Sequence, residues 1–279
     1  MPLFDQHLHS RHSCDSQADP AENVRQAIER GLAGLTFTEH FDVHPDDWAT
    51  CVYDDTAYSN TISSLRDSFG HRIFIGKGIE VCFQPERMDF ILDFLDRHEF
   101  DLIVLSIHYF DGKPLHRQRS WDGLDAQAGT ELYLRGALEA ASWCERTTKT
   151  QGRRFDVLGH LDLAKRYTRR FFDTYDMNPH RGLIDEILQT CLAAELTPEI
   201  NTSSLRQGLR ETMPGPPTIQ RYAQLGGTAM SVGSDAHRSQ DVGAGFDEAA
   251  GLLRSAGLSS VVFKQRVRTL VEVDFVQGR

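Results

Sequence analysis

The sequence predicts an α/β protein, most simply a seven-stranded (β/α) barrel with a metal site at the carboxyl ends of its strands. Two observations predict the fold: short apolar runs alternate with helical patterns along the chain, and there are seven such runs. Strands separated by helix-length connections pair in parallel. Histidines and acids placed directly after these runs predict the metal site. An open doubly wound sheet is the alternative fold, because periodicity does not reveal whether a sheet closes.

The candidate strands are short and rich in apolar and β-branched residues. They are Leu3–Phe4, Gly34–Thr38, Ile73–Glu80, Leu102–Ile107, Phe155–Leu158, Leu196–Ile200 and Thr228–Val232. The clearest helix between them is Asp19–Arg30, where Asp19 is a suitable N-cap, Pro20 fits the first turn and Gly31 follows the last turn. The other predicted helices are Thr56–Ser68, Pro85–His98, Thr130–Arg146, His180–Glu195, Pro217–Leu225 and Gly245–Ser255. The long polar stretch Tyr109–Gln127 is predicted to be a loop over a site.

Length and composition favour one globular domain that covers residues 1–279. The chain is 40% hydrophobic and 25% charged, which is typical of folded proteins, and α/β barrels of this length are commonly single domains. Its formal charge of −10 argues against a nucleic-acid or membrane surface. The five cysteines lack CxxC spacing, so no disulfide framework or zinc ribbon is indicated. With no signal-peptide pattern and no long apolar run, we expect a soluble protein of the cytoplasm.

Half of the histidines stand at or just after the ends of candidate strands. These are His7, His9, His40, His108, His160 and His237. The acids that join them are Asp15, Glu80, Asp162, Glu199 and Asp235. In a parallel α/β fold the carboxyl ends of the strands converge on one face, so residues far apart in the sequence can meet there. The pattern therefore predicts one polar cluster.

Two pairs with period-two spacing predict that this cluster binds metal. His7 and His9 lie on the same side of an extended chain, since side chains alternate along a strand. Asp235 and His237 repeat the spacing after the last candidate strand, and Glu80, which ends the third, could bridge two cations. Imidazole and carboxylate ligands together suit Zn, Fe or Mn, whereas Mg and Ca prefer oxygen ligands alone.

Each of these positions also has a purely structural interpretation. His108 or His160 alone is more commonly a hydrogen-bonded histidine at the rim of a sheet, Glu80 could end its strand in a salt bridge, and Asp15 could cap the next segment. Together they favour metal, because burying so many polar side chains on one face without a cation would carry a large desolvation penalty. Surface positions are expected for the remaining histidines, His12, His44, His71, His98, His116 and His180.

The segments that carry this pattern resemble the PHP superfamily, named for polymerase and histidinol phosphatase, and particularly its histidinol-phosphatase branch. They are His7-Leu-His9-Ser-Arg-His-Ser-Cys-Asp15, Thr38-Glu-His40, Gly78-Ile-Glu80, Ser106-Ile-His108, Gly159-His160-Leu-Asp162, Glu199-Ile-Asn201-Thr-Ser and Gly233-Ser-Asp235-Ala-His237. The resemblance spans most of the chain. It implies a distorted, TIM-like seven-stranded (β/α) barrel and a centre of up to three metal ions.

The resemblance also implies which residues bind each ion. His7, His9, Glu80 and Asp235 would hold the first ion, Glu80, His108 and His160 the second, and Asp15, His40 and His237 the third. Within this set, Glu80, Asp235 and His237 are the predicted catalytic residues. The nearest alternative is the amidohydrolase class of metal barrels, which also opens with two histidines on the first strand but has no ligands for a third ion.

A small phosphate monoester is the expected substrate. A hydroxide that bridges two ions would attack phosphorus in line while the third ion orients the phosphate oxygens. Arg166 and Arg206, similar to arginines of the histidinol-phosphatase branch, are candidates for phosphate contact, although either could be a surface ion pair. Tyr109 is a candidate for contact with the organic part. The resemblance implies L-histidinol phosphate and a step of histidine biosynthesis; the alternatives are another phosphomonoester, a phosphodiester or a non-catalytic metal-binding module.

Overall fold

The computed structural model describes residues 3–45 and 52–273, and one large sheet forms its centre. The strands follow the order β1–β2–β3–β4–β7–β8–β9–β10–β11. Neighbours from β1 to β10 pair in parallel, and β11 runs antiparallel to β10. The strands are β1 (Phe4–Leu8), β2 (Gly34–Phe41), β3 (Phe74–Cys82), β4 (Leu102–Ser106), β7 (Val157–Leu158), β8 (Thr197–Asn201), β9 (Ala229–Gly233), β10 (Ser259–Lys264) and β11 (Val267–Val271). The predicted α/β class with a parallel sheet is confirmed.

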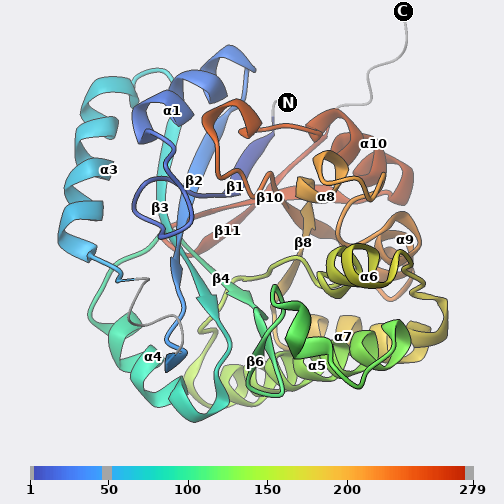
Figure 1. The fold of residues 1–279 in the computed structure, drawn as a ribbon. Helices are drawn as coiled ribbons and strands as arrows, with labels where there is room; N and C mark the ends of the chain where they lie inside the picture. Colours follow the sequence, from blue (N-terminus) through green and yellow to red (C-terminus); the bar gives the residue numbers. More distant parts are fainter. Residues whose placement is uncertain (1–2, 46–51, 274–279) are drawn as a thin grey trace, which may run out of the picture.

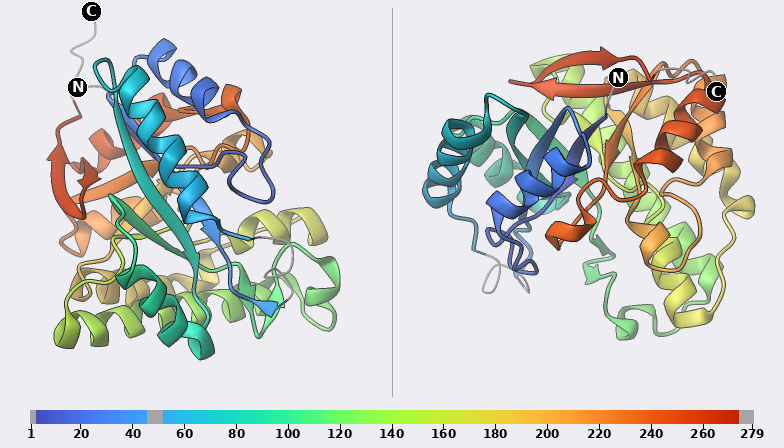
Figure 2. Two further views of the ribbon diagram at one scale, coloured as in Figure 1. Left: turned by 90° about the vertical axis from the view of Figure 1, so that its left-hand side faces the viewer. Right: turned by 90° about the horizontal axis from the view of Figure 1, so that it is seen from above.

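The sheet contains two strands more than the seven that the sequence predicts. Each predicted run overlaps one of β1 to β4 and β7 to β9. The additional strands β10 and β11 form a hairpin, so no helix separates them, and most of β11 is exposed to solvent. Strand β10 follows α10, pairs in parallel with β9 and is mostly buried, so it continues the alternation of strand and helix, and the predicted count of seven missed it. The exposed strand β11 follows β10 without an intervening helix and does not fit that alternation. Figure 2 shows this hairpin on the side of the molecule opposite to the second, smaller hairpin of β5 (Tyr109–Phe110) and β6 (Lys113–Pro114).

The first strand also contacts the segment that follows β9. Leu8 forms a parallel bridge with Ala236. The backbone N–H of Asp235 donates to the carbonyl oxygen of His7 over 2.6 Å. The backbone N–H of His9 donates to the carbonyl oxygen of Ala236 over 2.8 Å. These bonds join two segments of the chain that are more than 200 residues apart in sequence. They bring the two period-two pairs of the sequence side by side.

Helices surround the sheet, as Figure 1 shows. The seven predicted helices correspond to α1 (Pro20–Glu29), α3 (Asp55–Phe69), α4 (Met88–Asp96), α5 (Ala126–Gln151), α7 (Arg181–Ala193), α9 (Pro216–Gln224) and α10 (Phe246–Ala256). Short 3₁₀ turns occupy η1 (Pro85–Arg87), η2 (Gln118–Trp121), η3 (Asn178–His180) and η4 (Ser239–Asp241). The Asp19 side chain caps α1 as predicted, because it accepts hydrogen bonds from the N–H groups of Ala21 and Glu22.

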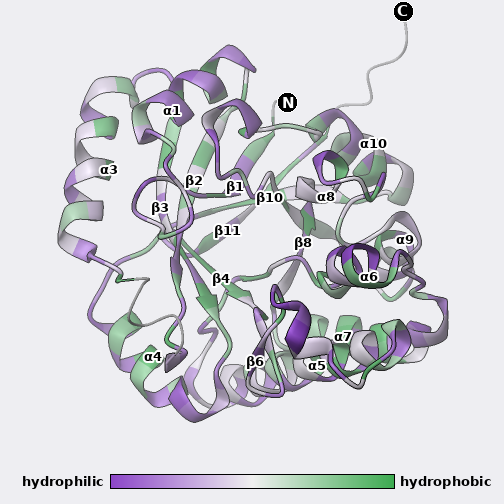
Figure 3. Ribbon diagram, in the orientation of Figure 1, coloured by the Kyte–Doolittle hydropathy of each residue, from purple (hydrophilic) through white to green (hydrophobic). Residues whose placement is uncertain are grey.

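Two helices that the sequence does not predict follow strands directly. They are α6 (Ala164–Phe172) after β7 and the one-turn α8 (Ser203–Arg206) after β8. Figure 3 shows that hydrophobic residues concentrate on the central strands and on the helix sides that face them, whereas α6 is largely hydrophilic. Helix α6 is amphipathic, but its buried face includes Lys165 and Thr168, so a search for apolar residues at helical spacing does not find it. Both helices begin at the end of the sheet where the candidate ligands lie.

Cysteine chemistry departs from the sequence-based expectation at one position. Cys82, Cys144 and Cys191 are buried and free, in keeping with structural roles. Cys14, by contrast, is disulfide-bonded, which the spacing of the cysteines did not predict. Cys51 lies outside the described residues. Within the described ranges, no helix has both the length and the apolar character that a membrane crossing requires.

Candidate metal centre

All nine predicted ligands lie at or beyond the carboxyl ends of the central strands. His7 lies in β1 and His9 just after it, Asp15 in the loop before α1, His40 in β2, Glu80 in β3, His108 after β4, His160 after β7, and Asp235 and His237 after β9. Seven of the nine line one cavity of about 340 Å³ together with Tyr109 and Arg166. The other two, His7 and His9, are almost completely buried. The parallel sheet thus brings the predicted set together.

Glu80 is the centre of this cluster. Its side chain is buried, and its Oε1 atom lies 3.0 Å from His160 Nε2 and 3.3 Å from His108 Nε2. Its other oxygen, Oε2, faces three further imidazoles: it lies 3.0 Å from His40 Nδ1, 3.3 Å from His7 Nε2 and 3.5 Å from His9 Nε2. One carboxylate therefore contacts five histidines, which is the geometry expected of a group that bridges two cations.

Asp235 faces two of the same histidines from the segment that follows β9. Its Oδ1 atom lies 3.5 Å from His9 Nε2 and 4.0 Å from His7 Nε2. The residue adopts a left-handed backbone conformation with φ of 51°, which is uncommon for residues other than glycine and occurs preferentially at functional sites. The hydrogen bond of its N–H to His7 holds this conformation in place.

Asp15 and His237 form the outer edge of the cluster. Asp15 Oδ2 lies 3.0 Å from His237 Nε2 and 3.5 Å from His40 Nε2, and the Asp15 side chain is 52% exposed. Several sets of three described side chains could each hold one metal ion, because their ligand atoms all lie within 4.8 Å of one another. They include His7/His9/Asp235, His7/Glu80/His160, His40/Glu80/His108 and His9/His40/His237. Asp15 belongs to none of these sets. The position of Asp15 is therefore the least suited to a tightly held ion.

The buried polar atoms of the cluster show whether cations fit there. Several have no hydrogen-bond partner among the described residues: His7 Nε2, His9 Nε2, His40 Nδ1 and Glu80 Oε2. A buried polar atom without a partner costs about 1–3 kcal/mol. Bound cations would satisfy all four atoms, and the mixture of imidazole and carboxylate suits divalent transition metals. The residues present therefore fit a metal centre.

The pKa values of the cluster shift in both directions. Although burial lowers the pKa of a buried imidazole, Glu199 and Glu80 raise the pKa of His7, and Glu80 and Asp15 raise that of His40. Burial raises the pKa of the Glu80 carboxyl, but the neighbouring imidazoles of His7 and His108 outweigh burial and hold that pKa well below its usual range. Burial, with the nearby His237 and His40, lowers the pKa of His9 to about 3. Glu80 is thus ionised and His9 neutral at pH 7, and these are the forms that bind a metal.

Glu199 orients two of the candidate ligands. Its Oε1 atom lies 2.8 Å from His7 Nδ1, which leaves His7 Nε2 to face Glu80. Its Oε2 atom accepts hydrogen bonds from the backbone N–H of His160 over 2.9 Å and from Asn201 Nδ2 over 3.1 Å. The sequence places Glu199 at a strand end but does not reveal that it contacts His7 and His160. A carboxylate that fixes the tautomer of a histidine ligand is common at metal sites.

Two further acids support the cluster and were missed. His9 Nδ1 lies 3.1 Å from Ser13 Oγ, which in turn donates to Glu39 Oε2 over 2.5 Å. His108 Nδ1 lies 2.9 Å from Asp42 Oδ2. The only indication of Glu39 and Asp42 in the sequence is that they lie within two residues of His40. Nothing in the sequence separates such supporting acids from ordinary surface acids without the fold.

Gly233 gives Glu199 the space that it occupies. A Cβ atom at Gly233 would overlap both the Glu199 carboxylate and the Cβ of His7. We expect Gly233→Ala to destabilise the fold by about 1–3 kcal/mol, as overpacking commonly does, and to lower the zinc content of the purified protein. Thermal unfolding and elemental analysis would measure the two effects. Gly251→Ala in α10 is the matched control, because a Cβ there meets open space. Wild-type metal content in Gly233→Ala would show that metal binding does not depend on the position of Glu199.

Arg166 and Tyr109 lie beside the cluster, as predicted. Both line the cavity. Arg166 extends from α6, and its Nη2 atom donates to Ser203 Oγ over 2.5 Å and lies 3.5 Å from Asp235 Oδ2. Its Nε atom is buried without a hydrogen-bond partner among the described residues, so this donor is available to a ligand. The Tyr109 ring stacks on His44 with centroids 3.9 Å apart.

Arg206 is placed differently from Arg166. It does not line the described cavity. Its Nη2 atom donates to the backbone oxygen of Asp235 over 2.8 Å, and its Nε atom lies 3.5 Å from Asp241 Oδ2. Arg206 therefore holds the segment that carries Asp235, and only its buried Nη1 atom lacks a partner among the described residues.

Other polar residues of the sequence pattern lie outside the cluster. His12 Nε2 lies 2.9 Å from Thr61 Oγ1, away from the candidate ligands. Asp162 is buried and binds the ammonium group of Lys165 instead, over 2.9 Å. His180 was expected at the surface, but it is buried at the start of α7, where 7% of its surface is exposed.

Comparisons with known proteins agree with this geometry. The PHP domain profile matches residues 5–203. The chain is 28% identical over 272 residues to a probable histidinol-phosphatase of Clostridium acetobutylicum, which covers 95% of this chain and 98% of the relative. It is 27% identical over 277 residues to a probable histidinol-phosphatase of Deinococcus radiodurans, with 95% and 97% covered.

A solved structure with a similar fold carries both metal and ligands. The crystal structure of histidinol phosphate phosphatase from Lactococcus lactis, complexed with Zn, L-histidinol and phosphate, has a TM-score of 0.79 and 26% identity, and covers 96% of this chain and 98% of the other. The predicted resemblance is confirmed: with a match over most of its length, the chain belongs to the PHP domain family.

Proposed function

We propose that this chain is a metal-dependent phosphatase that hydrolyses L-histidinol phosphate to L-histidinol and phosphate, a step of histidine biosynthesis carried out in the cytoplasm. The convergence of six histidines and three carboxylates, seven of which line one cavity together with Arg166, carries this proposal. The similarity to a phosphatase that binds Zn, L-histidinol and phosphate supports the choice of substrate. A cavity of about 340 Å³ is within the range of small-molecule sites.

The cofactor of the proposed reaction is two or three divalent ions of Zn, Fe or Mn, held by His7, His9, Asp15, His40, Glu80, His108, His160, Asp235 and His237. When bound, such ions acidify water and stabilise the charge on the attacking and leaving oxygens of a phosphate ester. Phosphorus then gains a bond to the water oxygen and loses its bond to the ester oxygen, which leaves as the protonated alcohol.

The side chains have distinct parts in this proposal. Glu80 and Asp235 place negative charge between the histidines, where they would hold the cations. His237 lies at the accessible edge, where its side chain is 31% exposed, and is placed to face the phosphate. These three are the proposed catalytic residues.

Substrate contacts are assigned to residues at the cavity wall. The guanidinium of Arg166 would donate to phosphate oxygens through Nε, which has no hydrogen-bond partner among the described residues, since charge-assisted bonds to phosphate favour arginine. Arg206 does not line this cavity; it would reach the phosphate only through Nη1, and its other proposed part is to hold the backbone of Asp235. Tyr109 would contact the organic part of the substrate.

The ion bound by Asp15, His40 and His237 is expected to be the most labile. Asp15 is half exposed, and this set shares no bridging Glu80 carboxylate in the proposed assignment. Graded chelation of the fully loaded protein should remove one equivalent of metal before the rest. Elemental analysis and activity would be followed together during the titration. Simultaneous loss of all ions would contradict this ranking.

A panel of phosphate esters tests the proposed function. Purified protein loaded with Zn, Fe or Mn would be assayed with L-histidinol phosphate, a small aryl phosphate, a sugar phosphate and a phosphodiester. We expect the highest kcat/KM for L-histidinol phosphate. Preference for another ester would retain the phosphatase but change its substrate, and zero turnover of all four esters by the loaded protein would indicate a metal-binding module without catalysis.

A further inference from the structure

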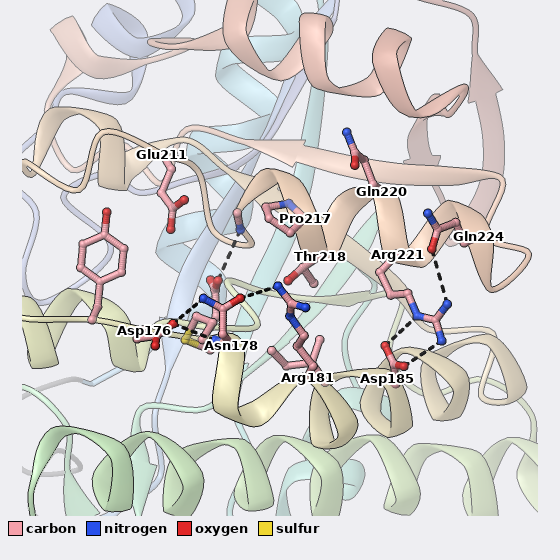
Figure 4. Close-up of a pocket in the computed structure, with 15 residues that line it drawn as sticks. Asp176, Asn178, Arg181, Asp185, Glu211, Pro217, Thr218, Gln220, Arg221 and Gln224 are labelled. Atoms are coloured by element: carbon pink, nitrogen blue, oxygen red, sulfur yellow. Dashed lines mark hydrogen bonds and ion pairs between the residues drawn. The ribbon is translucent and has the colours of Figure 1, made fainter.

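A second cavity of about 510 Å³ lies outside the metal centre. It opens between η3, the start of α7 and helix α9, and no residue that lines it also lines the cavity of the metal centre. Figure 4 shows Glu211 and Gln220 on one side of this cavity and Asp176, Asn178 and Arg181 on the other. Its volume is within the range of small-molecule sites, and the proposed phosphatase reaction does not use it.

A buried acid with an unsatisfied oxygen forms part of the wall of this second cavity. Asp162 is 1% exposed. Its Oδ2 atom lies 2.9 Å from Lys165 Nζ and accepts the N–H of Gly215 over 3.4 Å. Its Oδ1 atom is buried and has no hydrogen-bond partner among the described residues. An unpaired carboxylate oxygen in such a position calls for a donor that the protein does not supply.

The charges around Asp162 favour a cation. Glu211 also lines the cavity, and its Oε1 atom lies 2.9 Å from Lys165 Nζ. Lys165 is fully buried, and its ammonium group is occupied by Asp162, Glu211 and the carbonyl oxygen of Thr212. Two carboxylates thus share one ammonium, which leaves one excess negative charge at this end of the cavity.

The opposite wall carries the acids Asp176 and Asp185 together with two arginines, of which one can receive an anion. Arg181 donates to Asn178 Oδ1 over 2.5 Å and has no carboxylate within ion-pair distance in the described part of the chain. The other arginine of the cavity, Arg221, is already engaged by Asp185 through two bonds of 2.9 and 2.8 Å. A ligand carboxylate would therefore be received by Arg181 and not by Arg221.

We propose that this second cavity binds a small zwitterionic amine, with its ammonium group at Asp162 and Glu211 and its carboxylate at Arg181. The binding itself does not rest on the proposed phosphatase function. One consequence does: Lys165 is adjacent to Arg166, so an ammonium group that competes for Asp162 and Glu211 would loosen the ion cluster that anchors the start of α6. Occupancy should then raise the KM for the phosphate ester.

The probes are chosen to separate the two charges and to vary their spacing. Glycine, 4-aminobutanoate and 6-aminohexanoate carry both charges at increasing separation, butylamine carries only the cation, and butanoate carries only the anion. Calorimetric titration of metal-loaded protein, with inorganic phosphate present to occupy the metal centre, would give each Kd. We expect at least one zwitterion to bind more than about 10-fold tighter than butylamine, and butanoate to bind weakest.

Three variants locate the binding. Gln220→Trp fills the cavity from an exposed position without changing a charge, and should abolish binding of every probe. Arg181→Ala should reduce zwitterion affinity to that of butylamine, whereas Arg135→Ala on the exposed face of α5 should change nothing. Glu211→Gln should weaken all amines at least about 10-fold. Because Glu211→Gln also removes a contact of Lys165, its unfolding midpoint is measured alongside, and Gln220→Trp provides the test that does not depend on that contact.

The outcomes distinguish this site from the phosphatase proposal. Failure of all three zwitterions to bind, or unchanged binding in Gln220→Trp, would overturn the second site whatever the enzyme hydrolyses. Binding that Gln220→Trp abolishes supports the site even if L-histidinol phosphate is not the substrate. If a bound zwitterion leaves the KM for an active ester unchanged, the site stands and its coupling through Lys165 is refuted.

Discussion

Glu80→Gln is expected to lower kcat on L-histidinol phosphate by more than about 100-fold. Glu80 contacts five histidines through its two oxygens. An amide in its place would retain the shape but lose the negative charge and present an NH₂ group to imidazoles and cations. Residues that hold the metal ligands in place already affect metal affinity or activity by about 10–100-fold, so loss of the proposed bridging ligand should have a larger effect.

Metal content and kcat must be measured on the same sample of this variant. We expect less bound metal in Glu80→Gln than in the wild-type protein after identical loading. Glu139→Gln, an exposed position on α5, is the matched control and should keep both quantities. A Glu80→Gln protein with full metal content and wild-type kcat would remove Glu80 from the catalytic assignment.

Arg166→Ala is expected to weaken phosphate recognition while the metals stay bound. Hydrogen bonds to charged groups contribute about 1.5–3 kcal/mol, which corresponds to a decrease of about 10- to 150-fold in kcat/KM. Arg166 lines the cavity and retains a buried donor without a partner among the described residues. Arg169→Ala on the same helix removes an exposed arginine paired with Asp173 and is the matched control.

Arg206→Ala should give a mixed result, and this distinguishes the two arginines. Arg206 binds the backbone oxygen of Asp235 and does not line the described cavity. We therefore expect its loss to reduce metal content as well as kcat/KM. If either arginine variant keeps wild-type kcat/KM, that arginine makes no substrate contact. If both lose activity on L-histidinol phosphate but keep it on a small aryl phosphate, the arginines recognise more than the phosphate group.

Local sequence patterns were sufficient for the parallel sheet and for a cluster of histidines and acids at its carboxyl end, from which the family resemblance selected the nine candidate ligands. The alternation of buried strands with helices dictates parallel pairing, and parallel pairing places every strand end on one face. The two period-two pairs and Glu80 could therefore be assigned to one cluster before any coordinate was known. Asp19 at the start of α1 is a similar case, because its capping bonds involve only neighbouring residues.

Tertiary structure alone decided the parts that depend on contacts between distant segments. Glu199 supports His7 across 192 positions of sequence, and Arg206 binds the backbone of Asp235 rather than facing the cavity. The strand β11 is mostly exposed, and the buried face of α6 contains Lys165 and Thr168, so neither element shows the apolar face by which buried elements are recognised. Asp162 shares a motif with His160 but turns to Lys165 in another cavity. Spacing along a strand determines which side of the sheet a side chain occupies. Its contact partner comes from another part of the chain, and only the packing of the two segments brings them together.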